Sequence, residues 1–213
     1  MKDGSVVPRG PFEINGIPDR RDGEKCYFEE MSATILVPLA VGFEEIEAIV
    51  IIDLLRRANF KVITAGLLEG TIEASRRTRH LPDTTLEKVK DETFDAIVLP
   101  GGQPGTNHLK ADRRLRECLV RHARDGKWIA AICAAPMVLH AAGLISGRRV
   151  TSHPSVKEQL SDTHYCEERV VVDGKLVTSR GPGTAIEFAY ALVECLAGKA
   201  AVEEIERGVM AKH

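Results

Sequence analysis

Hydrophobic residues fall into four short, nearly continuous runs along the chain. The runs are rich in β-branched residues, which is typical of strands that are buried on both faces. They cover Thr34 to Leu39 (TILVPL), Lys61 to Ala65 (KVITA), Ala96 to Leu99 (AIVL) and Trp128 to Ile132 (WIAAI). Segments with the spacing of amphipathic helices lie between and after these runs. They cover Glu44 to Ala58, Asp112 to Arg124, Ala134 to Ala142 and Thr184 to Leu196.

This alternation of strands and helices predicts βαβ units with right-handed crossovers. We therefore expect an α/β fold, a three-layer α/β/α sandwich around a mainly parallel sheet. Two later runs, 169–173 and 176–179, flank a Gly-Lys pair and predict a β-hairpin. Thr184 and Glu187 have the spacing of a capping box at the start of the last long helix.

Residues 1–30 differ from the rest of the chain. They contain seven Gly and Pro residues and twelve charged residues. Their hydrophobic residues show neither the spacing of a helix nor the alternation of a strand. We interpret them as a flexible N-terminal extension or tag. The segment has no apolar run for a secretory signal, and its acids argue against a mitochondrial presequence. Residues 31–213 are interpreted as a single domain.

Composition narrows the range of partners. The chain is 44% hydrophobic, 28% charged and 5% aromatic, which is typical of a globular protein. A net charge of −2 gives no electrostatic argument for nucleic acid or an anionic membrane, and no run of 18 apolar residues predicts a bilayer span. The five cysteines include no CxxC pair, which fits a reducing compartment, so we expect a cytoplasmic protein. The histidines share no ligand spacing, and no metal site is predicted.

The segment AICAAP, with Cys133 at its centre, is the strongest chemical signal. A strand ends on the cysteine, a helix is predicted to begin directly after it, and small residues lie two positions before and after it. This pattern is typical of a nucleophile elbow. The positive end of the helix should lower the pKa of the thiol. The alternative is that Cys133 is a small buried apolar residue, as free cysteines often are.

Gly101 and Gly102 directly follow the strand AIVL and its proline. In a parallel sheet, ligands bind at the carboxyl ends of the strands, and paired glycines let backbone N–H groups approach them closely. We predict an oxyanion hole beside Cys133. A plain turn would explain the pair equally well. The glycines do not extend to a dinucleotide-binding or Walker motif, so nucleotide binding is disfavoured.

Glu47 lies in the first turn of the first predicted helix. It shares a helical face with Val50, Ile51 and Leu54, so we expect it to face the sheet and to have a raised pKa. A protonated carboxyl near Cys133 could donate a hydrogen bond to the thiolate and move protons. The alternative is a partly buried acid that is paired with an arginine.

Three other polar residues are considered for the site. Glu44 and Glu45 open the first helix, where acids favour the helix dipole, so capping and solvation explain them. His153 follows a short strand-like pair at 149–150. It could assist Cys133 or the substrate, or it could be a histidine of a surface loop.

Five motifs occur in order: GFEEIE with Glu47, VLPGG, AAICAAP with Cys133, TSHP with His153, and TSRGPGTAIEFA. Together they resemble the ThiJ/PfpI superfamily, most closely its parkinsonism-associated deglycase (DJ-one) and bacterial ThiJ-like branch, over about residues 31–208. The resemblance implies a flavodoxin-like fold, a homodimer, no cofactor, and a hydrogen bond from protonated Glu47 to Cys133. It also matches Arg76 and Arg180 to arginines near the family's site and dimer interface.

The activity implied by the resemblance is that of a glutathione-independent glyoxalase III and protein deglycase. The substrates would be methylglyoxal and the early glyoxal adducts of proteins. We expect Cys133 to attack the aldehyde while the N–H groups of Gly102 and Ala134 hold the oxyanion and Glu47 or His153 moves the proton.

Two alternatives remain. One is a redox-sensing chaperone in which Cys133 is oxidised and does not turn over a substrate. Members of the family are described as oxidative-stress sensors and as chaperones. The other is a cysteine peptidase or amidase of the same superfamily. That alternative is disfavoured because the peptidase branch has a histidine directly after the nucleophile, where this chain has Ala134.

Overall fold

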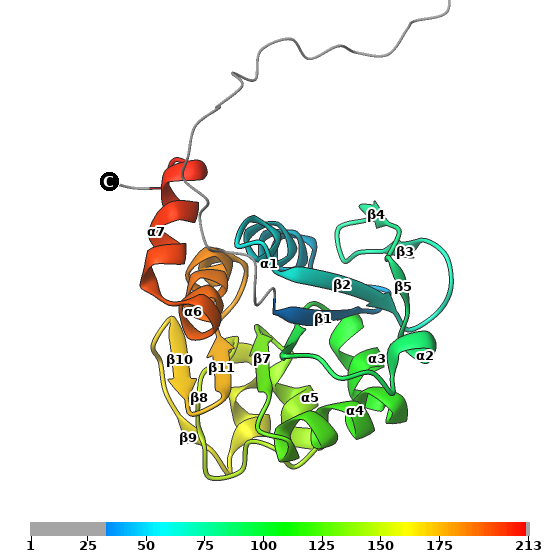
Figure 1. Ribbon diagram of the computed structural model, residues 1–213. Coiled ribbons are helices and arrows are strands. Elements are labelled where there is room, and N and C mark those ends of the chain that lie inside the picture. The colour runs from blue at the N-terminus through cyan, green and yellow to red at the C-terminus, as the bar shows by residue number, and fades with distance from the viewer. Residues whose placement is uncertain (1–32, 212–213) are drawn as a thin grey trace, which may run out of the picture. The chain divides into compact units, whose positions relative to one another are not determined.

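Seven strands form the central sheet of residues 33–211, the part of the chain that the computed structural model describes (Figure 1). In spatial order they are Val170–Asp173 (β10), Leu176–Ser179 (β11), Trp128–Ile132 (β7), Ala96–Leu99 (β6), Thr34–Leu39 (β1), Lys61–Gly66 (β2) and Thr84–Thr85 (β5). The neighbouring pairs are parallel, except that β10 and β11 form the predicted antiparallel hairpin. The predicted α/β fold with a mainly parallel sheet is confirmed. The predicted extension, 1–30, lies outside the described residues.

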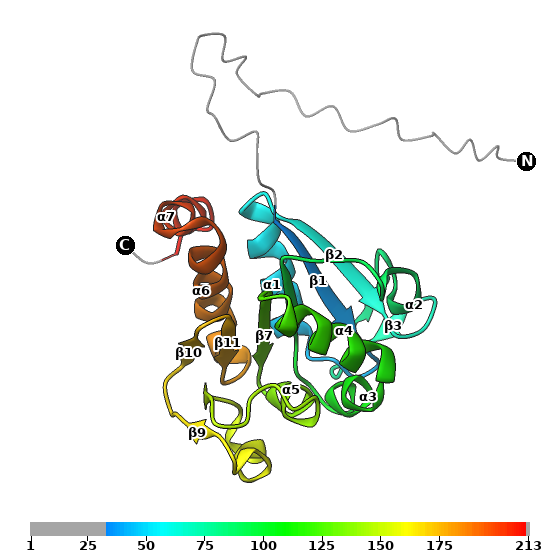
Figure 2. The same ribbon diagram turned by 60° about the horizontal axis from the view of Figure 1, so that its bottom comes forward.

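Helices cover both faces of the sheet (Figures 1 and 2). One layer contains Glu45–Arg57 (α1), Ala185–Ala197 (α6) and Lys199–Gly208 (α7). The other contains Leu86–Val89 (α2), Gly105–Ala111 (α3), Arg113–Arg124 (α4) and Pro136–Ala141 (α5). Successive strand side chains alternate between the two cores: Ile35 and Val37 pack in the first, and Leu36 packs in the second. No helix within 33–211 has the length and apolar character that a membrane span requires.

Several short elements extend the loops around the sheet. They are the paired strands Ile72–Glu73 (β3) and Arg79–His80 (β4), the paired strands Arg149–Val150 (β8) and His164–Tyr165 (β9), and the 3₁₀ helices Pro154–Leu160 (η1) and Pro182–Thr184 (η2). β8 was predicted as strand-like. The other five were not predicted.

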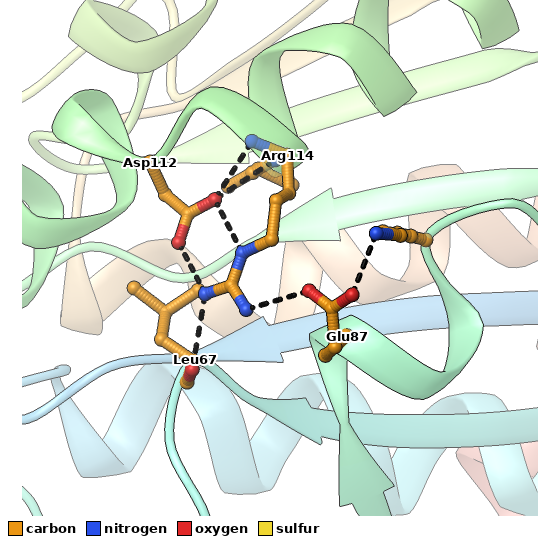
Figure 3. Close-up of polar contacts among 6 residues, drawn as sticks. Leu67, Glu87, Asp112 and Arg114 are labelled. Atoms are coloured by element: carbon orange, nitrogen blue, oxygen red, sulfur yellow. Dashed lines mark hydrogen bonds and ion pairs between the residues drawn. The ribbon is translucent and has the colours of Figure 1, made fainter.

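A polar cluster fastens the start of α4 to the loop after β2 and to α2 (Figure 3). The Asp112 side chain accepts hydrogen bonds from the first N–H groups of α4, including that of Arg114 at 2.9 Å. The Arg114 guanidinium donates to Asp112 at 2.6 Å, to the Leu67 carbonyl at 3.1 Å and to Glu87 at 3.1 Å. Three segments far apart in sequence are thereby held together at one corner of the sheet.

The predicted capping box at Thr184 is wrong. The Thr184 hydroxyl turns back toward the preceding loop, where it contacts the Ser179 hydroxyl at 2.7 Å and the Gly181 N–H at 3.1 Å. Glu187 forms an ion pair with Arg169 at 2.8 Å instead of reaching the start of the helix. The spacing was right for a capping box, but these tertiary contacts compete for both side chains.

Candidate active site

The carboxyl ends of β7, β6 and β1 bring three predicted site residues together. Cys133 directly follows β7, Gly101 follows β6 after one proline, and Glu47 lies in the first turn of the helix that follows β1. The three strands are neighbours in the sheet and run in the same direction. Their loops therefore meet at one edge, where ligands bind in open α/β sheets.

Cys133 has the strained backbone of a nucleophile elbow. Its φ is +63°, a backbone angle that residues other than glycine rarely adopt. Its N–H donates to the Ser179 carbonyl at 3.0 Å, and its carbonyl accepts the His153 N–H at 2.8 Å. The next helix, α5, begins at Pro136 rather than directly after the cysteine. The predicted start at Ala134 is therefore two residues too early, because a tight turn separates the strand from the helix.

Glu47 is completely buried, as its position on the apolar face of α1 predicted. Its Oε2 accepts the Gly101 N–H at 2.7 Å. Interaction with the Cys133 side chain favours the ionised form of the carboxyl. Its Oε1 has no hydrogen-bond partner among the described residues. Burial raises the pKa of Glu47 to about 7, and the negative charge of Glu44 adds to the rise. Glu47 is therefore paired with the cysteine and not with an arginine.

The Cys133 thiol does not have the lowered pKa that its position before a helix predicted. Burial, followed by the charge of Glu47, raises its pKa to about 12, although hydrogen bonds from the Gly102 and Ala134 N–H groups act in the opposite direction. The repulsion from Glu47 disappears when Glu47 is protonated. The two side chains thus form a coupled pair that favours one negative charge and one proton, with the proton able to lie on either group.

The two glycines after β6 have different roles. The Gly102 N–H and the Ala134 N–H are directed at Cys133, as expected for an oxyanion hole. The Gly101 N–H is donated to Glu47, so the expectation that Gly101 also serves as an oxyanion donor is wrong. Gly102 has a φ of +92°, and a Cβ on it would lie 2.3 Å from the Glu44 nitrogen. Only glycine fits this backbone.

The backbone N–H of His153 donates a hydrogen bond to the Cys133 carbonyl, and the His153 side chain is exposed. The ring Nδ1 accepts the Ser155 N–H at 3.2 Å and lies 2.7 Å from the Ser155 hydroxyl. Because a backbone N–H can only donate, Nδ1 must carry a lone pair, and the proton of the neutral ring is on Nε2.

The two arginines do not contact the cysteine pair. Arg76 is exposed, and its Nη1 donates to the Ser75 carbonyl at 3.3 Å. The Arg180 Nη1 donates to the Glu167 carbonyl at 2.8 Å. Neither guanidinium has a hydrogen bond to Cys133 or Glu47 within residues 33–211, and their substrate or interface roles remain predictions.

Glu44 and Glu45 are buried rather than solvated, each with 9% of its surface exposed. Glu44 caps α1 as expected, since its Oε2 accepts the Glu47 N–H at 2.9 Å. Glu45 accepts hydrogen bonds from the Ser75 hydroxyl and the Arg76 N–H, both at 2.9 Å. Burial opposes ionisation of Glu45, but these bonds outweigh it and its pKa is lowered. No local pattern predicts this contact with a turn thirty residues away.

The other cysteines and the acids do not form a second centre. Cys118 is buried in α4, and Cys166 and Cys195 are partly buried. Among the described residues, no group of three or more His, Cys, Asp or Glu side chains is arranged to hold a metal ion.

Known proteins share this sequence and fold. A profile of the DJ-1/PfpI family matches residues 33–195. Protein dj-1beta of Drosophila melanogaster is 47% identical over 183 residues, covering 84% of this chain and 98% of that protein. Its crystal structure superposes with a TM-score of 0.83 at 46% identity, covering 86% of this chain and 100% of that one.

A second relative carries a functional name. Glutathione-independent glyoxalase DJR-1.2 of Caenorhabditis elegans is 40% identical over 171 residues, covering 79% of this chain and 90% of that protein. The sequence similarity spans the strands and loops that build the cysteine site, and the predicted family is confirmed. This chain belongs to the DJ-1/PfpI family.

Proposed function

We propose that this protein is a glutathione-independent glyoxalase that converts methylglyoxal to lactate through Cys133 without a cofactor. The observation that carries the proposal is the coupled pair of Cys133 and buried Glu47, with two backbone N–H groups directed at the cysteine. The name of the C. elegans relative supports the same reaction class.

The first step uses the ionised form of the cysteine. The Cys133 thiolate adds to the aldehyde carbon of methylglyoxal, and the carbonyl electrons move to oxygen. The N–H groups of Gly102 and Ala134 hold the oxyanion, and the Glu47 carboxyl gives it a proton. The product is a hemithioacetal, and Glu47 is left as a carboxylate inside the site.

The second step is an internal oxidation and reduction. The Glu47 carboxylate removes the proton from the former aldehyde carbon, and an enediolate forms with its negative charge on the former ketone oxygen. Glu47 returns this proton to the former ketone carbon, and the hydroxyl proton on the former aldehyde carbon passes to the former ketone oxygen, which gives a lactoyl thioester. Water then cleaves the thioester to lactate and regenerates the thiol. No external oxidant or reductant is needed, because one carbon is oxidised as its neighbour is reduced.

His153 enters this scheme as a donor rather than a base. Its Nδ1 is occupied by the Ser155 N–H, so the neutral ring offers only the Nε2 proton to a ligand. We assign proton transfer between the carbons to Glu47, whose pKa near 7 suits a group that both gives and takes a proton. For a glycated protein, the same cysteine attack would end in release of the amine, which is the proposed deglycase activity.

Lactate formation from methylglyoxal tests the proposal. The assay omits glutathione, contains a metal chelator, and compares the wild type with Cys133→Ser, Glu47→Gln and the control Cys166→Ser. We expect the first two variants to lose more than about 10²-fold in turnover, and the control to retain it. A wild type that makes no lactate would reject the glyoxalase. Mass spectrometry after mild peroxide would then test the redox sensor by addition of two oxygens to Cys133.

We also propose that the protein is a homodimer. Ile46 and Ile49 on α1 are 55% and 44% exposed, and burial of such side chains in an interface would be favourable. Sedimentation velocity should show a dimer that dissociates when both isoleucines are replaced by glutamate. A monomeric wild type at micromolar concentration would contradict the proposal.

A further inference from the structure

Three hydrogen bonds join Glu44, Glu47 and Gly101 into a closed ring. The Gly101 N–H donates to the Glu47 carboxyl at 2.7 Å, and the Gly101 carbonyl accepts the Glu44 N–H at 2.9 Å. The Glu44 carboxyl accepts the Glu47 N–H at 2.9 Å. The ring fastens the first turn of α1 to the end of β6, and Glu44 contributes one backbone and one side-chain bond to it.

Glu44 is an unusual choice for this position. Ser, Thr, Asp and Asn are the preferred N-cap residues because their short side chains reach the free N–H groups of the first turn. Here a longer acid caps α1 and is 91% buried. The ion pairs formed within residues 33–211 do not include Glu44, so no cation of this part of the chain is paired with its carboxylate. Capping alone does not require such a charge.

We propose that Glu44 is a positioning residue for the cysteine pair: it fixes the turn that carries Glu47, and its negative charge keeps the proton of the pair on Glu47. The negative charge of the pair then lies on the Cys133 sulfur, where it is needed for attack. Glu44 thus acts through Glu47 and does not touch the sulfur or the substrate.

The groups that act on Glu47 come from three elements. Glu44 lies on its own helix, Cys133 comes from the turn after β7, and the uncharged Gly101 N–H comes from the end of β6. The charge of Glu44 opposes ionisation of Glu47, in the same direction as burial. The neighbouring Glu45 is equally buried but is not among the groups that shift the pKa of Glu47, and its carboxyl is bound to the Ser75–Thr78 turn.

The pH dependence of Cys133 alkylation by iodoacetamide tests this role without any turnover. Glu44→Gln keeps an oxygen that can accept the Glu47 N–H and removes the charge. Loss of the Glu44 charge stabilises both anionic forms of the pair, the one with the charge on Cys133 and the one with the charge on Glu47. The form with the charge on Glu47 is stabilised more. We therefore expect the acid limb of the profile to move down by roughly half a pH unit and the neutral plateau to fall by about threefold.

Two further variants separate charge from structure. Glu45→Gln removes an equally buried charge next to Glu44, and its acid limb should coincide with that of the wild type. Glu44→Asp shortens the capping side chain and keeps the charge. It should therefore change the alkylation rate on the neutral plateau without moving the acid limb of the pH profile. An unmoved limb in Glu44→Gln, or an equal shift in Glu45→Gln, would overturn the proposal.

The consequence for catalysis rests on the proposed function. If the protein makes lactate, the acid limb of turnover in Glu44→Gln should shift together with that of alkylation. If the alkylation limb shifts and no variant makes lactate, the glyoxalase is rejected and the role of Glu44 stands. If lactate is made and neither limb moves, the role of Glu44 is rejected and the glyoxalase stands.

Discussion

Gly101 lies so close to Cys133 that a Cβ built on it would be 2.6 Å from the Cys133 Cβ. The same added atom would be 2.9 Å from the Glu47 Oε2 and 2.9 Å from the Ile132 carbonyl. Two of these neighbours are held by the backbone and cannot swing away. The close approach lets the Gly101 N–H reach the buried carboxyl while the cysteine packs against the same glycine. Glycine is therefore required here for space rather than for backbone freedom.

Gly101→Ala should disrupt the pair. The extra methyl must displace the end of β6 or the Cys133 turn, and overpacking of this kind costs about 1 to 3 kcal/mol. We expect a lower free energy of unfolding in urea and slower alkylation of Cys133. Gly208→Ala is the matched control, since an added Cβ there meets nothing within 4 Å. Equal stability and equal alkylation in Gly101→Ala would show that the loop relaxes freely.

Glu47 should make the protein less stable as the pH rises. Its pKa is raised from 4.5 to about 7 in the folded state, so folding favours its protonated form. This contribution is fully present below about pH 4.5 and is lost as the pH rises through 7. It amounts to about 3 kcal/mol across that window. Glu47→Gln mimics the protonated acid and should not show this loss.

The measurement is the difference in unfolding free energy between the wild type and Glu47→Gln from pH 5 to 8. Titrating groups other than Cys133, whose pKa depends on Glu47, change alike in both proteins. They include His122, whose pKa burial lowers and whose contribution to stability is lost as the pH falls. We expect the wild type to lose stability relative to the variant as the pH rises. A difference that stays constant with pH would show that Glu47 is already ionised at pH 5.

The long central strands could be predicted because burial on both faces leaves an unbroken apolar run. The predicted bounds of β1, β6 and β7 match the structure, and β2 is one residue longer. Strands of two residues, such as β5, contain too few positions to show any period. α3 was missed because GTNHLKA has no clear apolar face. α7 was missed because its short amphipathic pattern follows directly after α6.

The chemical groups of the site were visible in the sequence, but their connections were not. Cys133 and Glu47 were found from local patterns, namely small residues around a strand end and one acid on an apolar helical face. The Gly101 bond to Glu47 spans 54 positions, and the chain between them has to fold before it exists. The raised pKa of Cys133 also depends on Glu47 and on burial, which overcome the effect of the following helix.

Cys133 stores backbone strain that glycine would relieve. Its φ of +63° is accessible to glycine at little cost, whereas an L side chain is strained there. We expect Cys133→Gly to be more stable than Cys133→Ala by about 1 kcal/mol. Cys118 is the control because it lies inside α4, where the order should reverse and glycine should be about 1 kcal/mol less stable than alanine. Denaturant titration of the four variants measures both differences. The same order at the two positions would contradict the strain at Cys133.

The contact between His153 and Ser155 should fix where the histidine carries its proton. The Ser155 N–H and hydroxyl both lie at Nδ1, at 3.2 Å and 2.7 Å, so the neutral ring should be protonated at Nε2. Long-range proton–nitrogen NMR at pH 8 distinguishes the two tautomers directly. In Ser155→Ala one donor is lost, and the Nδ1-protonated form should become detectable. Turnover should fall by about threefold, as expected for one hydrogen bond. Ser155→Thr keeps the hydroxyl and should restore the wild-type spectrum and rate. A wild-type ring protonated at Nδ1 would contradict both the tautomer and the donor role of His153.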